Sequence, residues 1–287
     1  MIFFLFLSNI TTRYPGQSSI NLENCILFRI QSSSYGGAIY QSGGSLKTIR
    51  CLFYECVSSS YAGGIYCSST NSIIKESCFF MDRAPHASSF MLEDSTNSVN
   101  LSTTVIIDPE SYWLSSYRRS SSVTSNCNVS HSVNYAAGCF DYANDPKIHI
   151  LFSFYYNVTT SFIALDYANS GCNNCVNRNC NFIRLTTSGS FIYPGHPISF
   201  INCDFIDNKY GYLFHSAGSG VRFTECVITF PLTDITSGGG THTNCTQFSQ
   251  VHSAPYVSKC VHLFSEQFTG EKAAVISALV YLFVLLL

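Results

Sequence analysis

The chain has 287 residues, of which 46% are hydrophobic, 15% aromatic and only 11% charged, and its formal net charge is -2. Such a chain is long enough to bury a sizeable core. The near-neutral charge excludes the basic surface that binds nucleic-acid phosphates, so no nucleic-acid partner is expected. Few charged residues with many small polar and aromatic ones favour a β-rich protein.

Residues 1–19 form a short N-terminal hydrophobic segment. Its first seven residues, MIFFLFL, are apolar without a preceding basic region, so we interpret them as a minimal or truncated signal peptide. Fourteen cysteines and several N-x-Ser/Thr sequons also favour the secretory route. We expect glycosylation at Asn100, Asn128, Asn157 and Asn244.

From residue 20 the sequence repeats a template of apolar, any, apolar, any, any, Cys, any, apolar. Its Cys position recurs at residues 25, 51, 78, 104, 127, 153, 180, 203 and 226, about every 23 to 27 residues, and the third copy is read as Ile73, Lys75, Cys78 and Phe80. Apolar residues alternate with period two, as in strands, and the two-residue step before Cys indicates a bend. The sequence therefore predicts an all-β, right-handed parallel β-helix, a single-stranded solenoid of about nine coils within residues 20–265.

The template cysteines predict an interior ladder of mostly unpaired thiols. Stacked equivalents lie about 4.8 Å apart with parallel side chains, whereas a disulfide needs Cβ atoms about 3.8 Å apart. The expected ladder is Cys25, Cys51, Cys78, Cys180, Cys203 and Cys226. Disulfides, if present, would use other cysteines, such as Cys56 with Cys67 or Cys245 with Cys260; Cys139 and Cys172 have no assignment. Cys172-x-x-Cys175 has metal-like spacing, but Cys175 occupies an inward template position, so no metal is expected there.

A second strand is expected in each coil. YGGAIY at residues 35–40 and YAGGIY at residues 61–66 are offset by 26 residues, and FDYAN at 140–144 recurs as LDYAN at 165–169. The glycine pairs suit a corner where the backbone needs positive φ or approaches the next coil closely.

Two candidate sites lie in the middle of the chain. Trp113, with Arg118 and Arg119, is a candidate contact patch for a sugar or a protein partner. Asp141 and Asp166 occupy equivalent places in successive coils, so their carboxylates could hold Ca²⁺ or form an acid pair. Alternatively, Asn144 and Asn169 stack as an amide ladder and the aspartates cap turns. No cofactor is expected.

The C-terminal residues 273–287, AAVISALVYLFVLLL, carry no charge. As a helix they would reach about 22 Å at ~1.5 Å per residue, which is short for a hydrocarbon core of about 30 Å. We expect a transmembrane span, with a lipid-anchor signal as the alternative. Both place the protein at the cell surface, membrane-anchored and mostly extracellular.

The coils resemble the polymorphic outer membrane protein type of β-helix, which has a pectin-lyase-like fold and carries GGA-I and F-x-x-N signatures. Residues Gly36 to Ile39 match the first motif, and Phe205 to Asn208 and Phe154 to Asn157 match the second. The resemblance implies a surface adhesin or antigen. A leucine-rich repeat is the rival fold because its strand has the same pattern, but it would need a helical second half in each repeat.

Two functions follow from this fold. The first is non-enzymatic adhesion or binding to a host protein, a matrix or a glycan. The alternative is a carbohydrate-active enzyme, a polysaccharide lyase or glycoside hydrolase, which needs acidic and basic residues that converge in one groove. The residues that decide between them are Asp141, Asp166, Asp204, Asp207, Arg184 and Arg222.

Overall fold

The computed structural model describes residues 19–68, 71–92, 99–102, 105–107, 116–118, 122–125, 127–130, 133–135, 141–142, 148–167, 175–215 and 220–248. The chain divides into two compact units, Met1–His252 and Ser253–Leu287, and every described residue belongs to the first. The N-terminal segment up to residue 18 and the apolar residues 273–287 lie outside the described residues.

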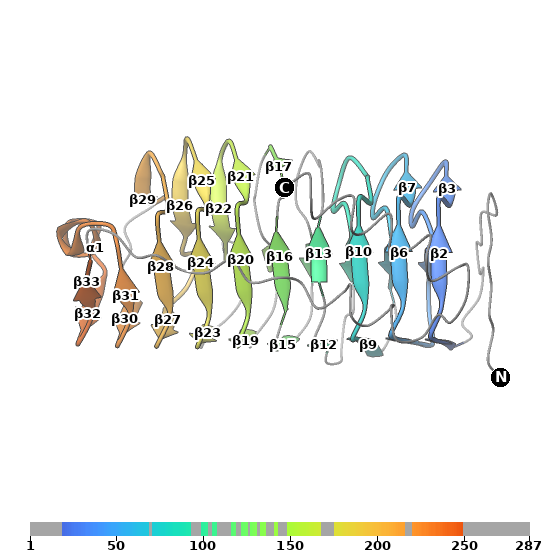
Figure 1. Cartoon of the computed structure of the whole chain (residues 1–287), viewed down its shortest axis with the longest axis horizontal. Coiled ribbons are helices and arrows are strands. Elements are labelled where there is room, and N and C mark those ends of the chain that lie inside the picture. The colour runs from blue at the N-terminus through green and yellow to red at the C-terminus, as the bar shows by residue number, and fades with distance from the viewer. Residues whose placement is uncertain are drawn as a thin grey trace, which may run out of the picture. The chain divides into compact units, whose positions relative to one another are not determined.

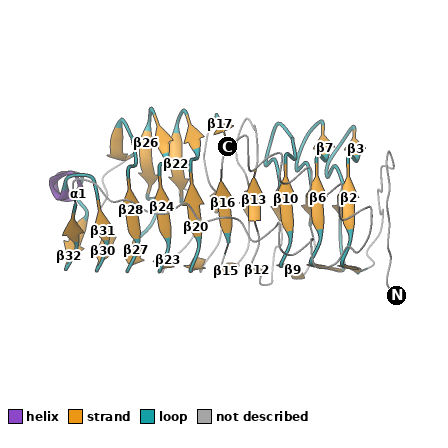
Figure 2. Ribbon diagram, in the orientation of Figure 1, coloured by secondary structure: helices purple, strands orange, loops and turns teal. Residues whose placement is uncertain are grey.

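The described residues build a parallel β-solenoid of about six turns, and every strand pair in them runs parallel. Equivalent strands of successive turns lie side by side in one row (Figures 1 and 2). The ladders continue through the shorter described stretches, so the two longest sheets have ten strands each. The count of about nine coils and the right-handed winding stay predictions.

Each full turn contributes a strand to each of three long sheets. The first sheet contains β1 (Ile20–Glu23), β5 (Ser45–Ile49), β9 (Asn71–Lys75), β12 (Val99–Ser102), β15 (Ser122–Ser125), β19 (Ile148–Leu151), β23 (Cys175–Arg178), β27 (Ile198–Ile201), β30 (Val221–Thr224) and β32 (Thr241–Thr243). The second sheet contains β2 (Ile26–Phe28), β6 (Leu52–Tyr54), β10 (Cys78–Phe80), β13 (Val105–Ile107), β16 (Asn128–Ser130), β20 (Phe154–Tyr156), β24 (Asn181–Ile183), β28 (Asp204–Ile206), β31 (Val227–Ile228) and β33 (Thr246–Gln247).

The third sheet closes the turn where a leucine-rich repeat would place a helix, so that rival fold is wrong for the described turns. It contains β4 (Ile39–Gln41), β8 (Ile65–Cys67), β11 (Phe90–Leu92), β14 (Ser116–Arg118), β18 (Asp141–Tyr142), β22 (Ile163–Asp166), β26 (Ser190–Tyr193) and β29 (Tyr212–Phe214). Two small sheets are formed by strands that lie, in chain order, between the second-sheet and third-sheet strands of a turn. They are β3 (Gln31–Ser32) with β7 (Val57–Ser58), and β17 (Val133–Asn134) with β21 (Thr159–Thr160) and β25 (Thr186–Thr187).

The bend predicted before each template Cys is a single residue in the left-handed region. This first corner has φ between 50° and 56° at Asn24, Arg50, Glu76, Phe152, Asn179, Asn202, Glu225 and Asn244. A non-glycine residue pays about 1–2 kcal/mol for this conformation. Its N–H donates to the next turn, for example from Asn202 to the carbonyl of Thr224 at 2.9 Å, which offsets that cost.

A second left-handed corner follows four residues after the template position. It has φ between 52° and 57° at Arg29, Glu55, Met81, Asn157, Arg184 and Asp207. The two corners explain why each turn folds into short straight strands, because each one rotates the chain without breaking the hydrogen bonds between turns.

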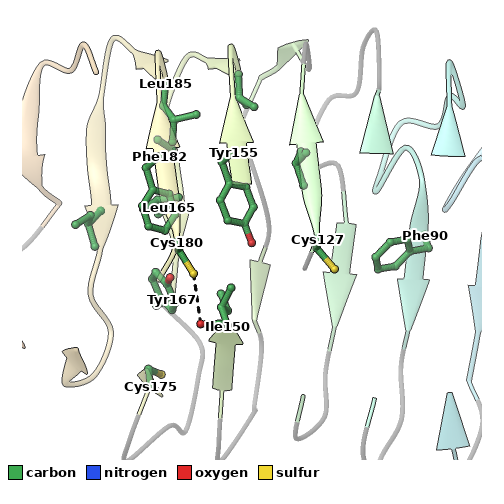
Figure 3. Packing of buried hydrophobic residues seen from close by; sticks show 14 of the residues in the cluster. Phe90, Cys127, Ile150, Tyr155, Leu165, Tyr167, Cys175, Cys180, Phe182 and Leu185 are labelled. Atoms are coloured by element: carbon green, nitrogen blue, oxygen red, sulfur yellow. Dashed lines mark hydrogen bonds between the residues drawn. The ribbon is translucent and has the colours of Figure 1, made fainter. Parts of the chain in front are cut away.

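The residue after the first corner is small and inward-facing in every described turn; we call this position the rung. The rungs are Cys25, Cys51, Ser77, Cys127, Ser153, Cys180, Cys203, Cys226 and Cys245, which each precede a second-sheet strand in the same register. Figure 3 shows Cys127 and Cys180 among the core side chains. The repeated Cys position was therefore a correct sign of a structural repeat.

The register predicted for the third turn is wrong by one residue. Cys78 pairs with Leu52, so Ser77 occupies the rung, and Ile74 is buried while Ile73 is 38% exposed. Serine fits the rung because its Oγ donates a hydrogen bond to the carbonyl of Lys75 at 2.9 Å. A thiol at the rung likewise donates to the carbonyl of the residue two positions earlier in the chain. The shift also brings Phe79 over Phe53, with ring centroids 4.6 Å apart.

Stacked aromatic rings fill the core behind the second sheet. Tyr155, Phe182 and Phe205 follow one another at centroid distances of 5.1 and 4.9 Å, and their side chains are almost fully buried. Figure 3 shows Tyr155 and Phe182 pointing inward from neighbouring turns. Each ring buries a large apolar area against its equivalent, so the stack stabilises the turns in register.

Only one of the two proposed F-x-x-N matches occupies the structural position of that motif. Phe205 is in the aromatic stack, and Asn208 Oδ1 accepts the N–H of Leu185 at 2.8 Å while its Nδ2 donates to the carbonyl of Phe182. The match at residues 154–157 is displaced by one residue, because Tyr155 aligns with Phe182 and Asn157 is a corner residue. In the third turn Asp82 takes the asparagine's place, with Oδ1 accepting the N–H of Cys56 at 2.8 Å.

At the C-terminal end of the described turns, α1 (Leu232–Ser237) packs on the core through fully buried Ile235. Tyr210 donates a hydrogen bond to Asp234 Oδ2 at 2.9 Å and so ties the helix to the preceding turn. The strands β32 and β33 that follow consist of Thr, His and Gln and are mostly exposed. A polar last turn protects the core of a solenoid from solvent.

Candidate functional site

Glycines at the corner before the third sheet let successive turns approach closely. Gly36 has φ of +61°, and a Cβ on Gly37 would lie 2.0 Å from the carbonyl oxygen of Gly63. Likewise, a Cβ on Gly63 would lie 2.5 Å from the backbone nitrogen of Arg83. The glycine pairs were predicted as such a corner, and the structure confirms the reason.

This close approach stacks the tyrosines on either side of the glycines. Tyr35 lies over Tyr61 with centroids 5.2 Å apart and rings 16° from parallel, and Tyr40 lies over Tyr66 at 5.5 Å and 11°. The two stacks touch each other, because Tyr35 and Tyr66 are 4.9 Å apart. His86 extends the first stack, 4.7 Å from Tyr61 and 20° from parallel.

These five residues, Tyr35, Tyr40, Tyr61, Tyr66 and His86, form what we call the tyrosine face. Beneath it lies a small apolar cluster of Ala62, Ala87 and Met91. Tyr35 is 38% exposed and the other rings are half-buried. The stacked rings cover one another's facing sides, so Tyr61 lies between Tyr35 and His86. Burial lowers the pKa of His86, so its imidazole is neutral at pH 7.

The described cysteines are either thiols or disulfide-bonded. Cys25, Cys51, Cys180, Cys203 and Cys226 are rungs and carry thiols, and Cys127 and Cys245 are further rungs in the same state. Cys78, which was expected among them, is instead disulfide-bonded and lies one residue past the rung, and Cys175 is also disulfide-bonded. The suggested pairing of Cys56 with Cys67 is wrong, because both are thiols, and so is the use of Cys245 in a disulfide.

Of the four predicted glycosylation sites, two have side chains that the structure describes. Asn157 and Asn244 are exposed corner residues. Asn100 and Asn128 belong to β12 and β16, and only the backbone of these two asparagines is described. Of the proposed contact patch, the backbone of Arg118 belongs to β14, and Trp113 and Arg119 lie outside the described residues.

The carboxylates and arginines that a hydrolase or lyase would need are spread over different faces. Asp141 pairs with Asp166 in the third sheet, as the repeat predicted, although their side chains are outside the description. Asp204 is in the second sheet, Arg184 and Asp207 are at the second corners of two successive turns, and Arg222 is in the first sheet. Within the described ranges, no three His, Cys, Asp or Glu side chains gather to hold a metal ion.

Sequence reasoning identified the tyrosine-containing repeat but not the tyrosine face. The signal was the 26-residue offset between YGGAIY and YAGGIY, which places Tyr over Tyr twice. His86 gave no such signal, because the third turn replaces the motif with His-Ala-Ser-Ser-Phe.

Within the described residues, no helix is both long and apolar enough to cross a membrane. Comparison of the chain with protein-family models, with curated proteins and with solved structures finds no match.

Proposed function

We propose that this chain is a non-enzymatic cell-surface protein, attached to the membrane through residues 273–287, whose solenoid binds a protein partner through the tyrosine face. The observation that carries the proposal is the stacking of four tyrosines and a histidine on one exposed surface. Tyrosine is enriched among the residues that dominate binding energy in protein interfaces, because it offers a large rigid area and a hydroxyl.

The orientation of the rings favours a protein over a glycan. An aromatic platform for a sugar offers an open ring face. Here Tyr61 lies between Tyr35 and His86, at 5.2 and 4.7 Å, and Tyr40 covers one face of Tyr66 at 5.5 Å. Ring edges beside backbone and small side chains fit the mixed apolar and polar contacts of a protein interface. The tyrosine rings are also held by their neighbours, so little side-chain entropy is lost on binding.

The resemblance to polymorphic outer membrane proteins supports the same role. The GGA-I motif of residues 36–39 lies between Tyr35 and Tyr40, at the base of the tyrosine face. The motif that carries the resemblance therefore also builds the proposed binding surface. Adhesion is the role that the resemblance implies.

Adhesion of cells that display the full chain tests the binding role. Replacing Tyr35 and Tyr61 together with Ser should lower adhesion to a protein-coated or cellular target about 30-fold, the effect of a hot spot of about 2 kcal/mol. Tyr135→Ser is the matched control, because Tyr135 is 56% exposed but lies next to β17 on other turns. Protease treatment of the target should abolish adhesion. Loss of adhesion after glycosidase treatment alone would show that a glycan is the partner.

Surface biotinylation tests the membrane attachment separately. The full chain on intact cells should be labelled, and a chain without residues 273–287 should appear in the medium. A chain that stays unlabelled in both forms would refute the surface role.

A further inference from the structure

Four successive rungs near the C-terminal end of the solenoid all carry thiols: Cys180, Cys203, Cys226 and Cys245, which we call the thiol quartet. The first three are buried, with exposed fractions of 0%, 0% and 1%, and Cys245 is half-buried in the last turn. Among the earlier rungs, Cys25 and Cys51 are also successive thiols, but Ser77 and Ser153 interrupt the row after them.

The thiols of the quartet interact with one another along the solenoid. Cys203 interacts with both Cys180 and Cys226, and Cys226 also interacts with Cys245. Each also donates to the carbonyl two residues back in its own turn, at 3.3 Å for Cys180, Cys203 and Cys226 and 3.5 Å for Cys245. The four thiols therefore occupy equivalent positions in four successive turns.

We propose that the thiol quartet binds soft monovalent cations of the Cu(I) type, one between each two successive rungs, in linear coordination by two sulfur atoms. Thiolate sulfur is the protein ligand that Cu(I) prefers. A metal–thiolate bond is about 2.3 Å long, as for zinc, so a cation midway between two rungs joins sulfurs about 4.6 Å apart. Adjacent parallel strands are about 4.7–4.9 Å apart.

The same geometry excludes Zn²⁺. Zinc needs four ligands in a tetrahedron, and within the part of the chain that the structure describes no three His, Cys, Asp or Glu side chains gather at one point. Sulfurs arranged in a line supply two ligands to each interval, which satisfies a two-coordinate ion only.

Charge and access are both compatible with such an ion. Each cation takes the place of one thiol proton, which leaves to solvent, and the second sulfur donates a lone pair, so the buried quartet stays neutral and no electron is transferred. Cys245 lies in a turn whose strands are mostly exposed, and it offers an entry at the end of the row.

The test is a titration of the reduced full chain with Cu(I) in the absence of oxygen, with bound ions counted by native mass spectrometry. Cys203→Ser should bind two fewer ions than the unchanged chain, because it removes the intervals on both sides of that rung. Cys245→Ser should bind one fewer. Cys127→Ser is the matched control and should bind as many as the unchanged chain, because Ser153 occupies the following rung and the preceding template position in the sequence is Thr104.

Serine already occupies the rung at Ser77 and Ser153, so these variants should keep the circular dichroism of the unchanged chain. Equal ion counts in Cys203→Ser and the unchanged chain would overturn the proposal, and so would an equal loss in Cys127→Ser. Displacement of Cu(I) by Zn(II) would also overturn it, because it would require a tetrahedral site. If Cys203→Ser does not fold, Cys245→Ser at the half-buried end decides the question.

Discussion

At the scale of the residue, the rung shows why a single position repeats so regularly. It must be small enough to fit inside the bend, and it must donate a hydrogen bond to the carbonyl two residues earlier, as Cys180 does to Arg178 and Ser153 does to Leu151. Cysteine and serine meet both conditions, whereas alanine meets only the first. The recurrence of Cys is therefore a requirement of the backbone at this bend.

Substitutions at Cys180 test this requirement. Cys180→Ser should change the free energy of unfolding little. Cys180→Ala should cost about 1 kcal/mol, because the carbonyls of Arg178 and Ile150 lose the thiol as a donor, and Arg178 keeps the N–H of Phe152. Cys180→Leu should cost about 1–3 kcal/mol more through overpacking. Thermal unfolding followed by circular dichroism ranks the three variants. Equal stability of the Ala and Ser variants would show that size alone selects this residue.

The first corner carries a second prediction at this scale. Phe152 has φ of 50° and is 58% exposed, whereas four equivalent corners in other turns have Asn, namely Asn24, Asn179, Asn202 and Asn244. Asparagine tolerates the left-handed region better than an aromatic residue. Phe152→Asn should therefore stabilise the fold by about 0.5–1 kcal/mol, seen as a rise in melting temperature; Asn202→Phe should have the opposite effect.

At the scale of the element, α1 is a short helix that tertiary contacts hold in place. Its first turn has no side-chain cap, and its six residues are too few to be stable alone. Buried Ile235 and the hydrogen bond from Tyr210 to Asp234 attach it to the preceding turns. The helix therefore depends on the solenoid, and in turn it covers the core at this end.

Removing the Tyr210 hydroxyl should loosen this helix. Tyr210→Phe should cost about 1.5–3 kcal/mol, because a partly buried hydrogen bond to a carboxylate is lost. Burial raises the pKa of Tyr210, and Asp234 adds to this shift. The hydrogen bond therefore stabilises the fold fully below the ordinary tyrosine pKa, and this contribution is lost as the pH rises through the raised pKa of the folded state. Hydrogen exchange of α1 should thus quicken in the variant and, at strongly alkaline pH, in the unchanged chain. No change in the variant would show that Ile235 alone holds the helix.

At the scale of the whole molecule, the described unit is quasi-one-dimensional, since each turn is hydrogen-bonded only to the turns before and after it. Stability in such a protein is a sum of turn and interface contributions, and a local defect stays local. The tyrosine face and the thiol quartet lie on different turns, so they can be altered independently.

Gly37→Ala tests this locality. The new Cβ would lie 2.0 Å from the carbonyl of Gly63, so the first two turns must separate. Hydrogen exchange should become fast in β4 and β8 while β23 to β30 keep their protection. Uniform loss of protection along the chain would mean that the solenoid unfolds as one cooperative unit.

The repeat in the sequence predicted the fold, the rung and the glycine corner, but not the register of the third turn. Ile73 and Ile74 are adjacent and equally apolar, and Ser77 and Cys78 are both small, so two registers satisfy the pattern equally. The stacking of Phe79 on Phe53 decides between them, and this is a contact between turns that a pattern within one turn does not contain. The tyrosine face escaped prediction for the same reason, because it exists only between turns.

The two left-handed corners also determine where this protein can change. The side chains at these corners are exposed or half-buried, so their identity is almost independent of the core, although Asn carries a smaller conformational cost there than other residues with a Cβ. This chain already uses Asn, Arg, Glu, Asp, Met and Phe at these positions. Two lines of side chains along the solenoid are therefore open to evolutionary variation, so the charge of these lines can drift while the fold stays constant.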